Sequence, residues 1–335
     1  RRSDEFQQIT SHMQEGLVLL NESGAVLSIN PAACRVFGTG ESCLGQDFLT
    51  VDRGRDVSDA LASAMDAGHS EVRVQRLGRI YQFDISRIQS GPDTLGAVLL
   101  AFDITQQETA EQSRREFTAN VSHELKTPLQ GIIGSAELIE NGLVKQEDLP
   151  RFVGHIRREA QRLVALIGDI IRLSQLDEGD PLPWEQVDIP ALCRDIAADL
   201  RDKAEKSRVS LTVEGQDVQA EGVRRLLHET IYNLCDNAIG YNVPGGSVRV
   251  TVSDAGENAV ISVADTGIGI APEHQSRIFE RFYRVDKSHS KASGGTGLGL
   301  SIVKHAVAYH HGTLNLESQP GKGTTITVTI PRKQS

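Results

Sequence analysis

The sequence predicts a multidomain chain in which an α+β module, an all-α antiparallel helical hairpin and an α/β sandwich follow one another. The chain has 335 residues, more than twice the roughly 150 residues of an ordinary domain. Its hydrophobic pattern changes from short strand-like runs over residues 1–104, to helical spacing over residues 105–180, to alternating helices and strands over residues 184–335. We expect these three ranges to be the domains.

The composition narrows the class of protein. Hydrophobic residues make up 39% of the chain and charged residues 24%, which is typical of a folded soluble protein. The net charge of −10 implies no broad basic face, so nucleic acid is not expected as a partner. The longest nearly uncharged apolar run, Leu95–Phe102, is far shorter than the ~18–20 residues that span a bilayer.

Two further features concern the environment of the chain. Its cysteines have neither the spacing of metal ligands nor the density of a disulfide scaffold, so we expect reduced thiols in a cytosolic setting at Cys34, Cys43, Cys193 and Cys235. The sequence starts at Arg1 without a methionine, which indicates a fragment or a processed product. We therefore expect an N-terminal segment to be missing.

The first module reads as a small antiparallel sheet with helices on one side. Strand-like runs are separated by turn signals such as Asn21–Gly24 and Ser90–Asp93. The expected strands are Gly16–Leu20, Ala25–Asn30, Val72–Leu77, Ile80–Ile88 and Gly96–Phe102. The expected helices are Pro31–Phe37 and Val57–Ala67.

The second segment reads as two long amphipathic helices joined by a short link. In the first, from Thr105 to about Asn141, apolar residues recur at helical intervals: Phe117, Val121, Leu125, Leu129, Ile132, Ala136 and Ile139. In the second, a seam is formed by Leu149, Ile156, Leu163 and Ile170 with Phe152, Ala160, Ile167 and Leu173. One hairpin would leave its apolar stripe in water, so we expect two copies to pair into a four-helix bundle, which makes the protein a homodimer through this segment.

Asp180–Pro183 breaks the second helix and precedes the third segment. There we expect helices at Ile189–Lys206, Val223–Tyr241 and Leu298–His310. Strands are expected at Val209–Val213, Ser247–Val252, Val260–Val263, Thr313–Leu316 and Thr324–Ile330. The glycine-rich stretch Lys287–Gly297 is expected to form a mobile lid.

One histidine stands out on the first long helix. At 100° per residue, His123 points about 175° away from the centre of the apolar stripe, so its ring is expected in water. Glu124 follows it directly and Thr127 lies one turn further on nearly the same face. Pro128 cannot donate to the carbonyl of Glu124, so we expect a bend just below the histidine.

The stretch Asn120–Leu129 closely resembles the phosphoacceptor box of sensor histidine kinases in order and spacing. The resemblance implies that His123 is the nucleophile that accepts the γ-phosphoryl group. An adjacent carboxylate is useful as base and orienting partner for an attacking imidazole, and Glu124 fits that role. Thr127, by its family position, would hold a water that removes phosphate from the response regulator, the partner protein of such kinases.

The first module resembles a PAS sensor domain. The stretches that carry this resemblance are Glu15–Leu20, Gly24–Val26, Ile29–Ala32 and Phe102–Thr105, the last leading into a helix. No cysteine context typical of flavin photoreceptors is present, and His69 alone is expected to be a surface or loop residue.

The third segment contains no Walker or Rossmann phosphate motif. It contains instead an ordered set of segments: Asn233–Ala238, Asp265–Ile270, Phe279–Phe282, Gly295–Leu300 and Gly321–Thr324. This set resembles the ATP-binding fold shared by gyrase, a heat-shock chaperone class, histidine kinases and mismatch-repair ATPases. The resemblance implies ATP and Mg²⁺ as cofactors.

The resemblance also assigns roles to single residues. Asp265 would accept the adenine amino group, with Gly267 and Gly269 allowing close approach of the backbone. Asn237 would bind Mg²⁺ with help from Asn233. Tyr241 and Thr324 would lie beside the nucleotide. Gly295, Gly297 and Gly299 would bring backbone N–H groups to the phosphates at the start of a helix. Arg284 would contact the γ-phosphate.

Two positions depart from related ATP sites. Gly240 stands where the histidine kinases usually have a lysine that approaches the phosphates, which weakens binding or turnover unless Lys287, Lys291 or Arg281 substitutes. Asn233 stands where hydrolytic relatives carry a glutamate base, so water is poorly activated and the phosphoryl group is kept for His123. Glu229, one turn earlier, is expected to be structural.

The sequence therefore predicts the cytoplasmic portion of a bacterial sensor histidine kinase, most similar to the phosphate-responsive and cell-wall-responsive groups. Its expected partner is the receiver domain of a response regulator, docked near Gln130 and Gly134, and its expected location is the inner membrane through a missing N-terminal segment. The protein is also expected to dephosphorylate that regulator. Two alternatives stay open: a PAS-controlled ATP-binding scaffold or phosphatase with weak kinase activity, and a gyrase-like hydrolase.

Overall fold

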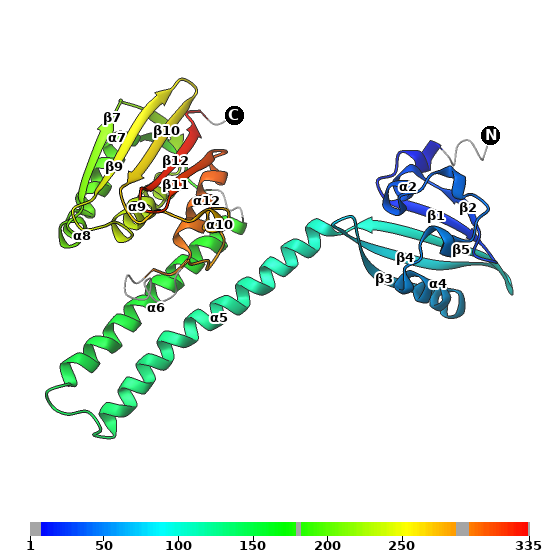
Figure 1. The fold of residues 1–335 in the computed structure, drawn as a ribbon, viewed down its shortest axis with the longest axis horizontal. Helices are drawn as coiled ribbons and strands as arrows, with labels where there is room; N and C mark the ends of the chain where they lie inside the picture. Colours follow the sequence, from blue (N-terminus) through cyan, green and yellow to red (C-terminus); the bar gives the residue numbers. More distant parts are fainter. Residues whose placement is uncertain (1–7, 179–181, 286–294, 334–335) are drawn as a thin grey trace. The chain divides into compact units, whose positions relative to one another are not determined.

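The fold comes from a computed structural model that describes residues 8–178, 182–285 and 295–333. The chain divides into two compact units, Arg1–Thr118 and Ala119–Ser335 (Figure 1). Among the described residues, no helix has both the length and the apolar character needed to cross a bilayer. The α+β module, the hairpin and the α/β sandwich are all present, whereas the expected domain boundaries stay predictions.

The first unit is built on a five-stranded antiparallel sheet. Its order is β2 (Val26–Ile29), β1 (Gly16–Asn21), β5 (Asp93–Asp103), β4 (Arg79–Ser90) and β3 (His69–Arg76). Apolar residues of α2 (Pro31–Phe37) and α4 (Arg55–Ala67) pack on one face around Phe83, Ile85 and Leu99. All five expected strands and both expected helices are confirmed within a few residues. The short η1 (Glu41–Cys43) and α3 (Phe48–Val51) were missed because three or four residues carry no periodicity.

Asn30 is buried and ties three segments of this unit together. Its Oδ1 accepts hydrogen bonds from the backbone N–H groups of Leu17 at 2.9 Å and Ala33 at 2.8 Å, so it caps the N-terminus of α2. Its Nδ2 donates to the carbonyls of Thr10 and Glu15. One short polar side chain thus satisfies backbone groups of the sheet, the helix and the N-terminal segment.

The joint between the sheet and the first long helix is a hydrogen-bonded turn. Asp103 Oδ1 accepts from the backbone N–H of Thr105 at 3.0 Å and from its hydroxyl at 2.6 Å. These bonds, with the Arg79 guanidinium at 2.8 Å from Oδ2, lower the pKa of Asp103. The Thr105 hydroxyl in turn accepts from Ile80 N–H at 2.9 Å. The helix therefore starts from a fixed point on β4 and β5.

The hairpin consists of α5 (Thr105–Glu140) and α6 (Leu149–Glu178), as the periodicity predicts. Asn141–Gly142 follows the end of α5, and Gly142 has a φ of 65°, a left-handed conformation that glycine adopts without strain. The helix runs without interruption through Pro128, which is buried. Pro128 therefore does not end α5, and the bend expected just below His123 stays a prediction.

The sandwich has a five-stranded sheet in which only β7 and β9 pair in parallel. Its order is β11 (Thr313–Gln319), β12 (Gly323–Pro331), β10 (Asn258–Asp265), β9 (Ser247–Ala255) and β7 (Ser210–Gly215). A two-stranded sheet of β6 (Glu185–Asp188) and β8 (Gln219–Gly222) and the short α10 (Pro272–Gln275) were not predicted, because each is only four residues long.

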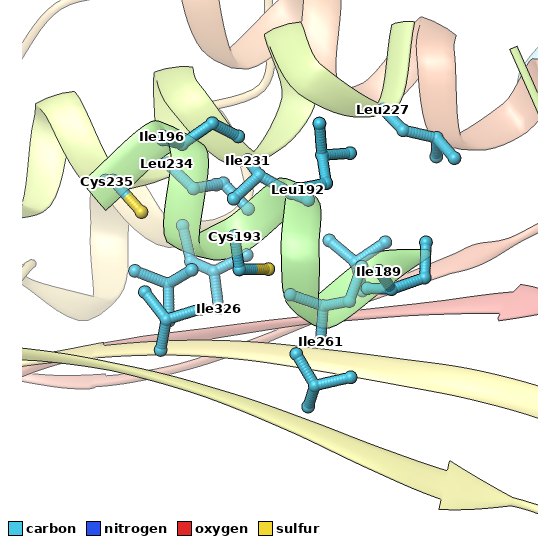
Figure 2. Close-up of a cluster of buried hydrophobic side chains, with 14 of the residues drawn as sticks. Ile189, Leu192, Cys193, Ile196, Leu227, Ile231, Leu234, Cys235, Ile261 and Ile326 are labelled. Carbon is cyan, nitrogen blue, oxygen red and sulfur yellow. The ribbon is translucent and has the colours of Figure 1, made fainter. Parts of the chain in front are cut away.

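Helices α7 (Ile189–Asp199), α9 (Arg224–Gly240) and α12 (Gly299–Tyr309) supply apolar side chains to the core on this sheet. The continuous helix expected over Ile189–Lys206 is wrong, because the chain turns at Leu200 into a separate α8 (Arg201–Ser207). Leu200 and Ala204 both join the core, so the apolar stripe of α7 continues across the break into α8. Figure 2 shows this core, with α7 and α9 side chains facing strand residues Ile261 and Ile326.

Candidate active site

His123 lies on α5 with its ring in solvent. Its side chain is 77% exposed, and its Nδ1 lies 3.9 Å from Oε1 of Glu124. The outward direction follows from its position opposite the apolar stripe, as the helical geometry predicts. An imidazole so exposed is open to attack an incoming phosphorus atom, whereas its role as phosphoacceptor stays a prediction.

Glu124 is held by a residue that the sequence did not indicate. Its Oε2 accepts from Nη2 of Arg162 on α6 at 3.4 Å, and the side chain of Arg162 is only 13% exposed against 26% for Glu124. Leu143, in the turn between the helices, lies midway between residues 124 and 162 in the sequence. Counting outward from that turn would have placed Arg162 opposite Glu124.

Thr127 lies one turn beyond His123 and is exposed, as expected. Its hydroxyl donates to the backbone carbonyl of His123 at 3.2 Å. Threonine side chains in helices often donate to the carbonyl four residues earlier in this way. The hydroxyl oxygen can still accept a hydrogen bond from water, and the role of Thr127 in positioning water stays a prediction.

Asp265 ends β10 and forms the floor of a polar cavity of about 450 Å³ whose lining also includes Gln275 and Thr324. Its Oδ1 accepts from Gly267 N–H at 2.8 Å and from Thr324 N–H at 3.2 Å. Burial raises the pKa of Asp265, although these two N–H donors lower it. The carboxylate is therefore fixed in direction and keeps a second oxygen for an amino group.

Gly267 and Gly269 occupy positions where a side chain does not fit. A Cβ on Gly267 would lie 2.4 Å from the carbonyl oxygen of Tyr241. A Cβ on Gly269, whose φ is +68°, would lie 2.0 Å from the carbonyl oxygen of Gln319. The backbone after Asp265 thus passes directly against its neighbours, which agrees with the close approach that the sequence predicted.

Helix α9 brings together the residues predicted to hold the metal ion and to line the nucleotide. Asn233 and Asn237 are one turn apart and both partly exposed, and Tyr241 follows the helix as its C-terminal cap. A Cβ on Gly299 would lie 3.2 Å from Asn233 Oδ1, so this face of α9 is directed at the start of α12. Amide oxygens are the hard ligands that Mg²⁺ prefers, so the pair fits a magnesium ion.

The predicted phosphate-binding segment lies at the N-terminus of α12, which begins at Gly299 with Leu298 as its cap. Gly297 has a φ of +77°, and its carbonyl accepts from Phe282 N–H at 2.9 Å. A Cβ on Gly295 would lie 3.6 Å from Nη2 of Arg284. Backbone donors and one guanidinium therefore gather at a helix start, which favours an anion. The expected lid, Lys287–Gly297, lies mostly outside the described residues.

Arg284 connects the two parts of the candidate site electrostatically. Burial lowers the pKa of its guanidinium, Arg162 lowers it further, and Tyr241 and Glu124 raise it. The charge of Arg284 therefore interacts with Tyr241, beside the predicted nucleotide site, and with Glu124 on the hairpin. Such a position suits a cation that stabilises charge developing between the two.

Contacts between α6 and the α/β sandwich, which we call the nucleotide-binding body, were not predicted. Thr296 donates to Asp169 at 2.6 Å, and Arg172 Nε lies 2.8 Å from Oε1 of Glu229. Burial raises the pKa of both Asp169 and Glu229, and Oε2 of Glu229 is buried without a hydrogen-bond partner. The glycine-rich segment and α9 are thus attached to the hairpin in this arrangement.

The environment of Gly240 is open. A Cβ added there meets nothing within 4 Å. Of the cations expected to replace the missing lysine, Lys287 and Lys291 lie outside the described residues. Arg281 donates to both carboxylate oxygens of Asp177 on α6 at 2.8 Å, so it is engaged with the hairpin here.

An exposed histidine on a helical hairpin, next to a sandwich with an ATP-type pocket, defines the class of protein histidine kinases. Three family models match in this order: a PAS domain over residues 4–71, the His Kinase A (phospho-acceptor) domain over residues 113–179, and the histidine kinase-, DNA gyrase B-, and HSP90-like ATPase over residues 222–334.

Relatives agree with these matches. The sensor-like histidine kinase SenX3 of Mycolicibacterium smegmatis is 37% identical over 286 residues, which are 84% of this chain and 72% of SenX3. The sensor histidine kinase WalK of Bacillus subtilis is 30% identical over 338 residues, which are 97% of this chain and 55% of WalK. The chain belongs to the sensor histidine kinase family, and it spans little more than half the length of WalK.

A solved structure shows the same fold. The histidine kinase ThkA, in its complex with the response regulator protein TrrA, matches 98% of this chain with a TM-score of 0.54 and 21% sequence identity. The match covers 98% of the ThkA chain as well. The fold of this chain is therefore a known one.

Proposed function

We propose that this chain transfers the γ-phosphoryl group of ATP to His123 and then to an aspartate of a response-regulator receiver domain. The observation that carries the proposal is the exposed His123 ring beside Glu124, with Arg284 close enough for its charge to be influenced by that carboxylate. ATP binds with its adenine amino group on Asp265. The reaction belongs on the cytoplasmic side of a bacterial membrane, where ATP is available.

The contacts around His123 suggest how the step proceeds. Nδ1 faces Glu124, so Nε2 is the nitrogen that attacks the γ-phosphorus. The new N–P bond forms as the bond from phosphorus to the β,γ-bridging oxygen breaks, and ADP leaves. The proton on Nδ1 passes to Glu124, which Arg162 holds in place. Arg284 stabilises the charge on the transferring group.

Asn233 and Asn237 would hold Mg²⁺ through their side-chain oxygens. The ion would neutralise the phosphate charge and fix the orientation of the phosphates. Neither asparagine can act as a base toward water. The phosphoryl group is therefore reserved for the histidine, which argues against the hydrolase alternative.

The exposed apolar side chains of the hairpin support a homodimer. Leu129 and Ile133 on α5 and Val164, Ile167 and Ile171 on α6 are each at least 47% exposed. One hairpin cannot cover a stripe of this width. Two hairpins packed into a four-helix bundle remove it from water while leaving His123 outside.

The proposed partner is the receiver domain of a response regulator, and ThkA was solved in complex with the response regulator protein TrrA. Gln130 is exposed below His123, and a Cβ on Gly134 meets nothing within 4 Å. A partner helix therefore can approach α5 closely there. We also propose that Thr127 directs water at the phosphorylated partner, which makes the protein its phosphatase.

Incubation with γ-labelled ATP tests the kinase. We expect label that is stable to alkali, labile to acid and absent in His123→Gln. The matched control is His155→Gln on α6, which should keep full labelling. Label that persists in His123→Gln contradicts the assignment, and steady ATP turnover surviving that substitution favours the hydrolase.

Gly240 is the specific observation that favours the scaffold or phosphatase alternative. Because the position is open, Gly240→Lys can extend an ammonium group without a clash. A charge-assisted bond to phosphate contributes about 1.5–3 kcal/mol, so we expect ATP affinity to rise about tenfold. Gly240→Ala is the control for helix propensity, and equal affinities in the two variants would show that the missing lysine does not limit this site.

A further inference from the structure

Three potential metal ligands meet on the outer face of the sensor sheet. His69 and Glu71 lie two residues apart on β3, so both point away from the core, and β3 is an edge strand. In the register of β3 and β4, Glu71 is paired with Asp84 and His69 with Ser86. The kinase reaction and the nucleotide site use none of these residues.

The pairing of Glu71 with Asp84 is unfavourable by itself. Like charges directly opposite each other on neighbouring strands destabilise a sheet. In the described part of the chain, the only basic side chain in ion-pair distance of either carboxylate is His69. Its Nε2 lies 3.5 Å from Glu71 Oε1, and its Nδ1 lies 3.3 Å from Asp84 Oδ1. Arg73, further along β3, is paired with Glu108 instead.

The three side chains also have the spacing of a metal site. One ligand atom from each of His69, Glu71 and Asp84 can be chosen so that all lie within 4.8 Å of one another. With Nε2 of His69 as the ligand, Asp84, which lies beside Nδ1, has to rotate toward the Glu71 side of the ring to reach the same ion. The Ser86 hydroxyl lies 3.1 Å from His69 Nδ1 and can hold the ring when Nε2 is the ligand.

The chemistry of the set selects the kind of ion. Calcium and magnesium take oxygen ligands and coordinate poorly with an imidazole. One imidazole with two carboxylates suits a divalent first-row transition metal, with zinc accepting nitrogen and oxygen at about 2.0–2.2 Å. Three protein ligands leave one position for water, so the ion would exchange with solvent.

We propose that His69, Glu71 and Asp84 form a binding site for a divalent first-row transition-metal ion on the sensor module. The cation neutralises the facing carboxylates, and the antiparallel pair of strands holds the ligands in register. The site is independent of the proposed kinase reaction, because it lies in the first compact unit. A proton on His69 is the competing way to balance the two carboxylates.

Titration of the full metal-stripped chain with Zn²⁺ by calorimetry tests this proposal. We expect one site in the wild type, with affinity lowered at least about tenfold in His69→Gln and in Glu71→Gln. The control is His228→Gln, which removes an exposed imidazole beside a single carboxylate, Asp199 at 4.0 Å. That variant should bind Zn²⁺ as the wild type does.

Thermal unfolding gives a second readout, because an ion that binds only the folded state raises its midpoint. We expect Zn²⁺ to raise the unfolding midpoint of the first unit in the wild type and not in Asp84→Asn. Ca²⁺ should have no such effect. Equal Zn²⁺ affinity in wild type and His69→Gln, or no binding to either, would overturn the metal site and leave the proton as the balancing charge.

Discussion

The nucleotide-binding body buries its large apolar side chains, whereas the helical hairpin leaves several of them exposed. In the body, side chains from α7, α9 and α12 close over the sheet, and Ile196, Ile231 and Ile261 are fully buried (Figure 2). In the hairpin, Val164 is 71% exposed and Ile171 52% exposed. The core of the body is closed within one chain, whereas the hairpin leaves large apolar side chains exposed, as the proposed dimer requires.

The largest effect is expected from placing charge on the hairpin surface. Val164→Asp with Ile171→Asp puts two carboxylates where the proposed partner copy packs. Burying each apolar side chain contributes about 1.5–3 kcal/mol, and symmetry counts each one twice. We expect the dimer dissociation constant to rise at least about 100-fold, measured by light scattering at several concentrations.

Leu77→Asp is the matched control for this experiment. Leu77 is also a strongly exposed apolar residue, but it lies in the turn between β3 and β4. Its substitution should leave the dimer intact. A wild-type chain that stays monomeric, or a doubly substituted hairpin that dimerises normally, would remove the contrast between the two regions.

A smaller effect is expected from removing the ion pair that joins the two helices of the hairpin, between Arg162 on α6 and Glu124 on α5. Arg162→Ala frees Glu124 from its ion pair, so the base is less well placed beside His123. We expect autophosphorylation at saturating ATP to slow about tenfold, with the ATP dissociation constant unchanged and partial rescue by Arg162→Lys. Arg158→Ala, one turn earlier on α6, should be silent. An equal loss in both variants would mean that the effect is general helix damage.

The pH dependence of ATP binding tests whether the carboxyl of Asp265 is buried from water in the pocket of the nucleotide-binding body. Because burial raises the pKa of this carboxyl, it takes up its proton at a higher pH than an ordinary aspartate. ATP needs the ionised acceptor, so we expect affinity to weaken severalfold as pH falls through that raised pKa. The control is Asp265→Asn, which should bind weakly with no such pH dependence.

The stability of the ligand-free body should change in the opposite sense. A raised native pKa means that the folded state binds the proton more tightly than the unfolded chain, so the contribution of Asp265 to stability declines as pH rises between the ordinary and the raised pKa. Calorimetric unfolding of wild type and Asp265→Asn at several pH values measures it. A wild-type profile that parallels the variant would contradict the burial of this carboxyl.

The smallest effect concerns the thiols of the closed core. Burial raises the pKa of Cys193 and of Cys235 to about 12, so neither forms a reactive thiolate near neutral pH. We expect iodoacetamide to leave both unmodified in the native protein and to label them in urea, as peptide mass spectrometry would show. Labelling of either at the rate of the unfolded chain would mean that the core opens readily.

Much of this contrast could be predicted from the sequence, because periodicity and motif order are local properties. The outward direction of His123 follows from rotation about a helix, and the glycines after Asp265 follow from the order of the motifs. The helix break at Leu200 could not be predicted, since both flanking segments have helical patterns and only packing decides. The four-residue strands β6 and β8 were too short to leave a signal.

The contacts that join elements were also beyond the sequence. The pairing of Arg162 with Glu124 depends on the register set by the turn, and the bond of Thr296 to Asp169 depends on how the nucleotide-binding body meets α6. Neither residue of α6 belongs to a recognisable motif. Charged residues on long helices are usually solvated, so their type alone did not distinguish these two.

The most direct measurement is the site of phosphorylation after incubation with ATP and Mg²⁺, mapped by mass spectrometry at neutral to alkaline pH, which preserves phosphohistidine. The account predicts one phosphoryl group on the peptide that contains His123, and much less of it when Asp265→Asn weakens nucleotide binding. Phosphate on another of the 10 histidines, or on a serine or threonine, would contradict it.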